Sequence, residues 1–237
     1  MTPAYQMRIL LVKVTFPWDD HLMSVSTGKT DYVQPIVLLR AGTHEDAVRA
    51  AAVASVTAWV AAPDHPGWEP WLATGFAKSV RRAKPAQFEA LRSAALSEYG
   101  RGDARALAFA PVAYDEMPRE LGRLQVSGTD LERAGWDSPA PDVPAGTLVP
   151  EIVMNEGLGM TTGKACAQAA HALFVWAACA DPDRLSAWVA AGGPVSVTGL
   201  GKAAFEAAAD GPCAVVISDA GHTEIDPGST TALVLAA

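Results

Sequence analysis

The 237-residue sequence contains little cysteine and no long apolar run near its start. Its three cysteines are odd in number, form no C-x-x-C pair and lie in apolar or alanine-rich surroundings, which favours a reducing compartment and small core side chains. They are Cys166, Cys179 and Cys213. The early apolar run Ile9–Val12 is interrupted by Lys13, so it is too short for a signal sequence or a membrane span. We therefore expect a cytoplasmic protein.

The sequence also lacks the common motifs for nucleotides, metals and serine catalysis. Gly163-Lys164 and Gly28-Lys29-Thr30 have no glycine five positions before their own glycine, so neither is a phosphate-binding P-loop. The five histidines and three cysteines show no zinc spacing, and G-x-S-x-G is absent. Stretches that interleave basic and aromatic residues are absent too. We expect no metal, no cofactor, no DNA partner and no membrane partner.

Basic residues are scarce in the C-terminal part. From Trp136 onward there are three, Lys164, Arg184 and Lys202, against eleven acidic residues, so the net charge of −8 arises there. Such a surface repels a polyanion overall. The N-terminal part is balanced and carries one basic cluster, Lys78–Lys84, which could face a phosphate backbone or could be a solvated strand end or turn.

The chain contains an internal repeat with an offset of 117 residues. The matching residues are Trp176 with Trp59, Trp188 with Trp71, Ser196 with Ser79, Val197 with Val80, and Ala203, Phe205, Glu206 and Ala207 with Ala86, Phe88, Glu89 and Ala90. Each copy runs as a strand, an alanine-rich helix, a short amphipathic segment, a strand, a short helix and a strand. This alternation predicts an α/β layer fold. With 50% hydrophobic residues, the chain can form two domains of about 110 residues.

The repeat sets the expected domain boundaries. Residues 1–32 precede the repeat, as an added strand and loop or as an extension. The first copy spans residues 33–133 and the second spans residues 148–237. Residues 134–147 form the expected linker, because their three prolines cannot lie inside a helix or a central strand.

Two strings in the second copy carry the chemistry. The string Gly159–Ala172 places Lys164 in the opening turn of a predicted helix, where the helix dipole disfavours a cation. A phosphate or a developing oxyanion, held also by free N–H groups of that turn, would account for the lysine. The string Asp219–Gly228 follows a predicted strand. In the first copy Ala47 replaces Lys164 and the second string is missing. We expect a site in the second copy alone, the alternative being that both copies are scaffold.

These strings resemble the type II peptidyl-tRNA hydrolase family. The resemblance rests on Met160–Ala172 and Ile217–Thr231, covers Val149–Ala237 directly, and extends to Val33–Ser127 as a degenerate echo. It implies tandem α/β/α three-layer repeats with small mixed sheets. Since family members form homodimers, it also implies that the two copies pack as an intrachain pseudo-dimer.

The resemblance further implies hydrolysis of the ester that joins a peptide to the terminal ribose of tRNA, without metal or cofactor. The family's functional positions correspond to Lys164, Asp219 and Thr223. Asp219 would orient or deprotonate a water, Lys164 would hold an oxyanion or a phosphate, and Thr223 would position the water or the ribose. Each could instead be structural, as a turn residue or a solvated first-turn lysine.

Further residues are candidates for binding the tRNA 3′ end. They are Gly163, Gln168, His171, His222, Lys78, Arg81 and Arg82. His171 shares a helix face with Gln168, and it could line the site or be a hydrogen-bonded core histidine. The basic cluster of the first copy could supply charge to the site of the second.

The sequence departs from the family pattern at three positions. Relatives often carry a basic residue where this chain has His222, a lysine where it has Val195, and Arg-x-Asp where it has Asn155–Gly157. Two alternatives to tRNA hydrolysis follow from the lost charge: a non-catalytic binding protein that keeps the fold, and an esterase or amidase acting on a small peptide conjugate.

Overall fold

A computed structural model describes residues 32–74, 76–136, 143–144, 146–219 and 224–235. In the N-terminal half the elements are β1 (Tyr32–Leu39), α1 (His44–Ala61), α2 (Trp68–Ala73), β2 (Lys78–Ala83), α3 (Pro85–Leu91), β3 (Ser97–Arg101), β4 (Ala104–Ala108), β5 (Val112–Ala113) and α4 (Arg119–Gly122). In the C-terminal half they are β6 (Glu151–Asn155), α5 (Thr162–Cys179), α6 (Pro182–Ala190), β7 (Ser196–Leu200), α7 (Lys202–Ala209), β8 (Cys213–Ser218) and β9 (Thr230–Leu235). The expected extension lies almost entirely outside the described residues, as does half of the expected linker.

Each half forms one small mixed sheet. In the first sheet the strand order is β2-β1-β4-β3; β1 is parallel to β2 and antiparallel to β4, and β3 is antiparallel to β4. In the second sheet the order is β7-β6-β9-β8, with β6 parallel to β7, β6 antiparallel to β9 and β8 antiparallel to β9. The predicted α/β class with small mixed sheets is therefore confirmed. The fourth strand of each half, β4 in the first and β9 in the second, was not identified from the sequence pattern, and neither was the two-residue strand β5, which pairs with β1.

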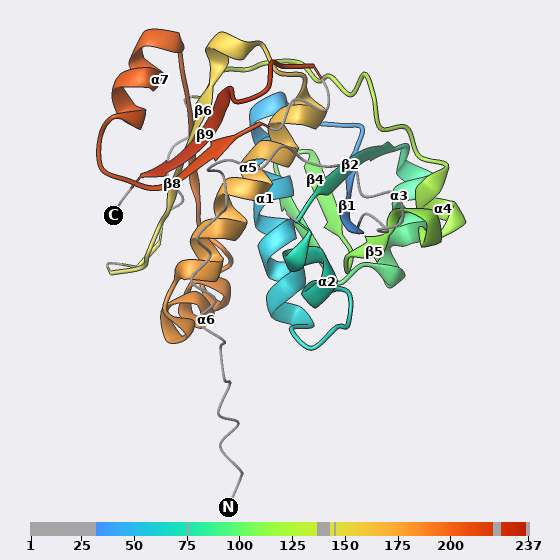
Figure 1. The fold of residues 1–237 in the computed structure, drawn as a ribbon. Helices are drawn as coiled ribbons and strands as arrows, with labels where there is room; N and C mark the ends of the chain where they lie inside the picture. The colour runs from blue at the N-terminus through green and yellow to red at the C-terminus, as the bar shows by residue number, and fades with distance from the viewer. Residues whose placement is uncertain (1–31, 75, 137–142, 145, 220–223, 236–237) are drawn as a thin grey trace, which may run out of the picture.

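The elements form successive layers from one side of the molecule to the other. Figure 1 shows α7, the second sheet, α5, α1, the first sheet, and then α3 and α4. The largest apolar cluster joins the inner faces of both sheets to α1 and α5, and includes Leu38, Val80, Ile152 and Val234. Smaller clusters lie on the outer face of each sheet, around Phe88 in the first and around Phe205, from α7, in the second. The central helices thus lie inside a core that both halves share.

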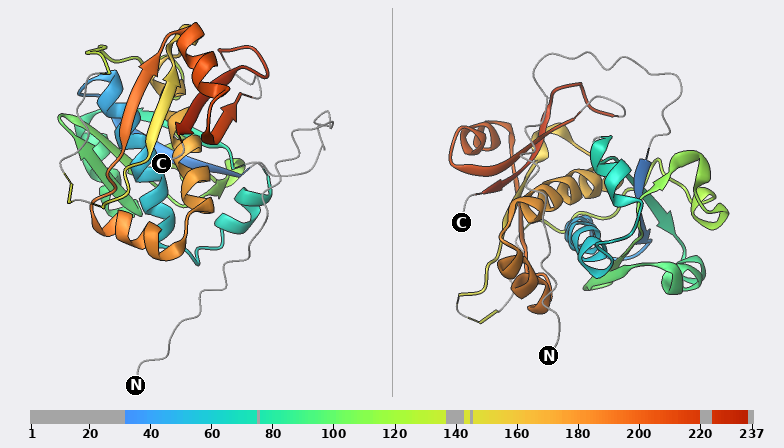
Figure 2. Two further views of the ribbon diagram at one scale, coloured as in Figure 1. Left: turned by 90° about the vertical axis from the view of Figure 1, so that its left-hand side faces the viewer. Right: turned by 60° about the horizontal axis from the view of Figure 1, so that its bottom comes forward.

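Helices α1 and α5 lie side by side through that core (Figures 1 and 2). Both contain 18 residues and are rich in alanine, and most of their residues are buried. A helix that is apolar on most of its circumference needs partners on several sides, and small side chains let it approach them closely. Towards the C-terminal ends of the helices the ring centroids of Trp59 and Phe174 are 5.1 Å apart. This packing makes each half part of the other's core.

A segment between the halves connects the N-termini of the two central helices. The backbone N–H of His44 donates to the Glu132 carbonyl, and Glu45 accepts from the N–H groups of Ala134 and Gly135. At the same end Nδ1 of His44 lies 2.9 Å from Oγ1 of Thr162, the first residue of α5. The N-termini of α1 and α5 are therefore fixed relative to each other.

The structure corrects one expectation about the cysteines. Cys166 is buried in α5, as expected, but Cys179 is exposed at the end of the same helix. The alanine-rich sequence around Cys179 does not reveal that α5 ends there and turns towards solvent. Within the described part of the chain, no helix combines the length and apolarity needed to cross a membrane.

Candidate active site

Lys164 and Asp219 form an ion pair at the N-terminus of α5. Lys164 is the third residue of this helix, in its opening turn as predicted, and Asp219 directly follows β8. The Nζ atom of Lys164 donates to Oδ2 of Asp219. Their side chains are 11% and 6% exposed. The fold thus brings together two groups that are 55 residues apart in the sequence, in a place where water has limited access.

A second pair of side chains fixes the carboxylate from the other side. Nε2 of Gln168, one turn after Lys164, donates to the same Oδ2 atom at 2.8 Å. Oγ1 of Thr231, on β9, donates to Oε1 of Gln168 at 2.8 Å. Because the threonine hydroxyl occupies the amide oxygen, the amide NH₂ is directed at Asp219. Thr231 and Gln168 are both buried, so this chain of hydrogen bonds is shielded from competing water.

The role of Thr231 was not assigned from the sequence. The residue lies twelve positions after Asp219, on the strand paired with β8, and only that pairing turns its side chain towards α5. The available signal was a pair of threonines, Thr230 and Thr231, at the start of the otherwise apolar strand Thr230–Leu235.

The N–H groups of the first turn of α5 are already hydrogen-bonded. The N–H of Gly163 donates to the Thr129 carbonyl at 3.0 Å, and those of Thr162 and Lys164 have the side chains of Asp130 and Thr161 as acceptors. This corrects the expectation that free N–H groups of this turn would hold an anion. A segment of the N-terminal half and the Thr161 side chain occupy them, so the ammonium of Lys164, rather than free N–H groups, is the candidate anion-binding group of this turn.

His171 lies on the same face of α5 and contacts the N-terminal half. It follows Lys164 by seven residues, and its ring centroid is 5.5 Å from that of Phe76. Burial, together with the nearby charges of Lys78 and Lys164, holds the pKa of His171 well below its usual value. His171 is therefore neutral near pH 7 and can accept or donate a single hydrogen bond at each ring nitrogen.

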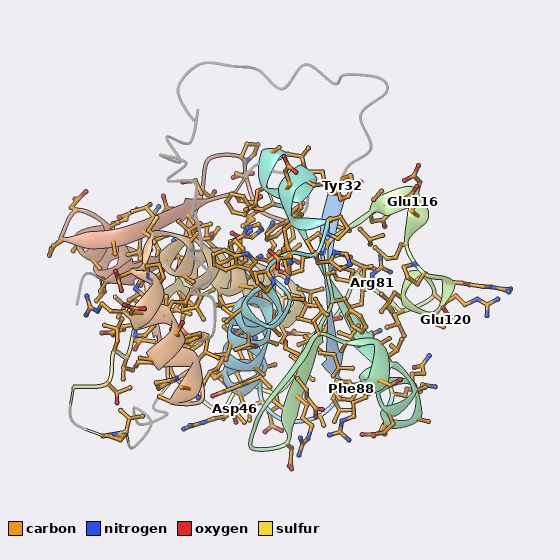
Figure 3. All side chains as sticks on the ribbon, turned by 90° about the horizontal axis from the view of Figure 1, so that it is seen from below. Tyr32, Asp46, Arg81, Phe88, Glu116 and Glu120 are labelled. Carbon is orange, nitrogen blue, oxygen red and sulfur yellow. The ribbon has the colours of Figure 1, made fainter. Side chains whose placement is uncertain are left out.

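The basic residues of β2 do not share one environment. Lys78 is half-buried, and its ammonium lies over the rings of Trp71 and Phe174, the latter from α5. Arg81 is 2% exposed, and its guanidinium donates to carbonyl groups at the end of α4, including that of Leu121 at 3.1 Å. Figure 3 shows Arg81 on the side of the first sheet that carries Glu120. Because Arg81 is buried on this outer face and its Nη1 donates to backbone carbonyl groups, we do not place Arg81 among the residues that contact substrate.

Arg82 and Gly163 have structural partners near the helix end. Nη1 of Arg82 donates to the Gly128 carbonyl at 2.7 Å. A Cβ atom on Gly163 would lie 3.3 Å from Cβ of Thr129, so glycine permits the close approach of this segment to α5. Both residues hold the segment that covers the N-terminus of α5.

Two candidates, His222 and Thr223, lie outside the described residues. The residues on either side are fixed. The N–H of Asp219 donates to Ser229 and that of Gly228 to Asp219, while Glu224 accepts from the N–H and the hydroxyl of Thr161. The ends of the loop that contains both candidates are thus held beside the first turn of α5.

The arrangement fits acid–base chemistry in which a carboxylate acts on water. Asp219 can accept a proton, Lys164 can stabilise a developing negative charge, and Gln168 keeps the carboxylate in one orientation. Thiol chemistry is disfavoured at Cys166, because complete burial raises the pKa of its thiol. The described residues include no group of three His, Cys, Asp or Glu side chains that could hold a metal ion.

The C-terminal half matches a known family. The family model described as peptidyl-tRNA hydrolase PTH2 matches residues 148–236. A protein of Schizosaccharomyces pombe named "Probable peptidyl-tRNA hydrolase 2" is 38% identical over 91 residues, which cover 35% of this chain and 44% of that protein. The chain thus spans less than half the length of this relative. No solved structure matches significantly.

Proposed function

We propose that this protein hydrolyses the ester bond of peptidyl-tRNA, because residues 148–236 match the peptidyl-tRNA hydrolase PTH2 family model and resemble a relative of that name. The reaction releases the peptide as a carboxylic acid and tRNA with a free ribose hydroxyl, so that the tRNA can return to translation in the cytoplasm. The observation that carries the proposal is the shielded Lys164–Asp219 pair, held by Gln168 and Thr231.

Asp219 is the proposed group that activates water. Its carboxylate orients a water molecule and accepts its proton while the water oxygen attacks the ester carbonyl carbon. The hydrogen bond from Gln168 to Oδ2 limits rotation of the carboxylate and so holds it in one orientation towards the substrate. The proton then passes to the departing ribose oxygen as the carbon–oxygen bond breaks.

Lys164 is the proposed stabiliser of the tetrahedral intermediate. When the carbonyl oxygen becomes an oxyanion, the ammonium can bind it while remaining near Asp219. The positive end of the α5 dipole adds to the field at the same point, although the N–H groups of this turn are used elsewhere. A single charged donor at a shielded site contributes on the order of 10²–10³ in rate.

Five other residues are proposed to contact or frame the substrate. Thr223 would position the water or the ribose, His222 and His171 would lie beside the RNA end, and Gln168 and Gly163 would shape the site next to Lys164. The neutral state of His171 suits hydrogen bonding to a base or ribose better than binding to a phosphate.

We also propose that the two halves, residues 33–133 and 148–237, are tandem repeats packed as an intrachain pseudo-dimer. Apart from the short strand β5, which pairs only in the first sheet, the strand order and strand sense of the two sheets are the same, and this supports the proposal. So does the pairing of two 18-residue helices, α1 and α5, in the positions that two identical subunits would share across an axis.

In the N-terminal half an ion pair of the opposite sense lies near the equivalent helix end. The 117-residue offset pairs Lys164 with Ala47; Asp46, one residue earlier, is the third residue of α1 as Lys164 is of α5, and Arg101 is the last residue of β3 whereas Asp219 directly follows β8. A carboxylate on the helix turn repels an oxyanion, and an arginine cannot accept a proton from water. The reversal supports one site per chain, in the C-terminal half.

The first test measures release of peptide from N-acetyl-aminoacyl-tRNA by the wild-type protein and by Asp219→Ala and Lys164→Ala. Both variants should lose at least a hundredfold in kcat/KM while remaining folded by circular dichroism. Asp226→Ala, an exposed carboxylate of the same loop, is the matched control and should retain activity. Absence of turnover by the folded wild-type protein would sink the proposal and favour a binding protein.

A salt titration separates tRNA from a small ester substrate. Contacts with phosphates make tRNA binding fall steeply with salt, whereas turnover of a small peptide ester responds little. Strongly salt-dependent KM values support tRNA; efficient, salt-independent turnover of the small ester alone supports the esterase alternative that the acidic C-terminal half suggests.

A further inference from the structure

A buried polar network fixes the ammonium of Lys78 at the boundary between the halves. Nζ of Lys78 donates to Oε1 of Gln34 at 3.1 Å, and the Ser55 hydroxyl donates to the same oxygen at 2.6 Å. Nε2 of Gln34 donates in turn to the Ser55 carbonyl. Gln34 and Ser55 are both 0% exposed. The orientation of the Gln34 amide is therefore determined, and its oxygen is aimed at Lys78.

Among the described residues, the equivalent positions of the second sheet carry no such network. Lys78 pairs with Gln34 in the register of β1 and β2. In the second sheet Glu151 pairs with Ser196, which places Pro150 beside Val195 one step earlier. Val195 is 1% exposed and belongs to the apolar core. Burying polar groups is costly, so apolar residues at the positions of Gln34, Ser55 and Lys78 would pack in the core at least as favourably. The polar network indicates a use for the lysine.

Aromatic rings, and no carboxylate of the described residues, neighbour the ammonium of Lys78. Its ammonium is 4.5 Å from the ring centroid of Trp71 and 4.7 Å from that of Phe174. Among the described residues, Lys78 takes part in no ion pair. Burial lowers the pKa of its amino group well below the usual value, and a neighbouring anion would counter that shift. An anionic ligand group thus complements this lysine.

Phe76, two residues before Lys78, holds an unusual backbone conformation. Its φ is +42°, in the left-handed region that bulky residues rarely adopt. The conformation is maintained by packing of the ring, with centroids 5.7 Å from Trp71 and 5.5 Å from His171. The side chain remains partly exposed. Backbone strain of this kind is found preferentially where a side chain must be presented to a ligand.

These groups lie in line with the proposed catalytic pair. Lys164, Gln168 and His171 recur at helical spacing on one face of α5, and His171 lies about 10 Å along the axis from Lys164. His171 contacts Phe76, and the positive charges of Lys78 and Lys164 both contribute to the lowered pKa of His171. These side chains therefore form a row that begins at Asp219 and Lys164 in the C-terminal half and ends at Phe76 and Lys78 in the N-terminal half.

We propose that Phe76 and Lys78 of the N-terminal half form the subsite for the terminal nucleotide of the tRNA acceptor strand, the base stacking on Phe76 and its phosphate binding Lys78. This deepens, and rests on, the proposed peptidyl-tRNA hydrolase function. Single-stranded RNA is commonly bound by an aromatic ring for the base and a cation for the phosphate. The ester on the terminal ribose then extends along α5 towards Lys164 and Asp219.

The test is fluorescence anisotropy with a labelled, deacylated RNA hairpin that ends in single-stranded CCA, compared with the same hairpin lacking the terminal adenosine. Wild-type protein should bind the CCA hairpin on the order of tenfold more tightly. Phe76→Leu, which keeps an apolar side chain but removes the ring, should abolish that difference. Tyr114→Leu, at an exposed aromatic on the other face of the first sheet, should preserve it.

Lys78 is tested through the salt dependence of the same binding. Lys78→Met removes one phosphate contact, so the slope of log K against log salt should become shallower by about 0.7. Lys202→Met, on exposed α7, should leave the slope unchanged. Lys78→Gln provides a second variant that can keep a hydrogen bond to Gln34, with the same expected slope.

Each outcome separates this subsite from the hydrolase proposal. Adenosine-dependent binding lost in Phe76→Leu supports the subsite, even if the wild-type protein proves unable to hydrolyse the ester. Turnover of peptidyl-tRNA without adenosine-dependent binding, or an unchanged discrimination in Phe76→Leu, would overturn the subsite and leave the hydrolase intact. Failure of the wild-type protein to bind the hairpin would also overturn it.

Discussion

Asp46 on the first turn of α1 faces Arg101 at the end of β3, with 3.8 Å between Oδ1 of Asp46 and Nε of Arg101. The same carboxylate oxygen lies 3.3 Å from Nη1 of Arg49, whose side chain is 2% exposed. In this half the carboxylate is on the first turn of the helix, where the positive end of the helix dipole stabilises it, and the cation is on the strand. The arrangement favours stability where the Lys164–Asp219 pair favours reactivity.

The substitution Asp46→Asn should therefore reduce stability and leave hydrolysis unchanged. Removing the charge leaves the buried Arg49 guanidinium with weaker acceptors, at a cost of about 1.5–3 kcal/mol in the free energy of unfolding. Chemical denaturation measures the loss, and kcat/KM for N-acetyl-aminoacyl-tRNA should stay within about twofold of wild type. A large fall in kcat/KM with little loss of stability would mean that this pair takes part in the reaction.

The substitution Thr231→Val should lower kcat more than it raises KM. It removes the hydroxyl that fixes Gln168, and the amide can then turn away from Asp219. We expect kcat to fall on the order of tenfold, because the carboxylate loses its fixed orientation, and stability to fall by about 1 kcal/mol. Steady-state kinetics and denaturation provide the two numbers. Thr198→Val, which removes a half-buried hydroxyl near Glu151, is the control, and equal effects in both variants would contradict the prediction.

Stability should decline as the pH falls from about 6.5 towards 4, in part because of His44. Burial, with a smaller effect of Arg133, lowers the pKa of His44 to about 4. In this range the unfolded chain binds a proton that the folded protein does not, so lower pH favours unfolding. The His44 contribution is on the order of 3 kcal/mol. In His44→Gln the free energy of unfolding should depend less on pH, as urea titrations at pH 7, 6, 5 and 4 would reveal. Parallel curves for the two proteins would exclude His44 as the cause.

The substitution Gly199→Ala should destabilise the fold, because a Cβ atom there would overlap the indole of Trp136. Trp136 also donates to Glu156 and packs edge-on against His44, so moving it disturbs the covering of both helix N-termini. Overpacking of this kind costs about 1–3 kcal/mol. Gly201→Ala, where a Cβ atom meets open space, is the control. Denaturation of both variants should distinguish them, and equal stability would show that the indole moves without cost.

The sequence predicted the fold class because its signals were local. Alanine-rich runs predicted α1 and α5, and the repeat predicted strands that alternate with the helices. The fourth strands, β4 and β9, were missed because a strand reveals its place only through its neighbours. The two halves share one core instead of forming two separate cores. This sharing arises from packing between residues far apart in the sequence, which local sequence patterns do not predict.

From the sequence, the site residues that could be predicted were those that lie within recognised motifs. Lys164, Gln168 and Asp219 lie within the two recognised strings, and the structure brings them together. Thr231 depended on strand pairing. Arg81 belonged to a basic run that looked uniform, yet alternation along β2 directs Arg81 to the outer face and Lys78 to the inner face. Charge in a sequence does not reveal which face of a strand carries it.

The contact between His44 and Thr162 joins residues that are 118 positions apart, and it has a consequence for synthesis on the ribosome. At about 5–20 residues per second, α1 emerges roughly 6–24 s before α5. During that interval the apolar side of α1 that α5 will cover is open to other chains. The nascent N-terminal half is thus a candidate client for chaperones, and slow translation of the connecting segment would prolong its exposure to aggregation.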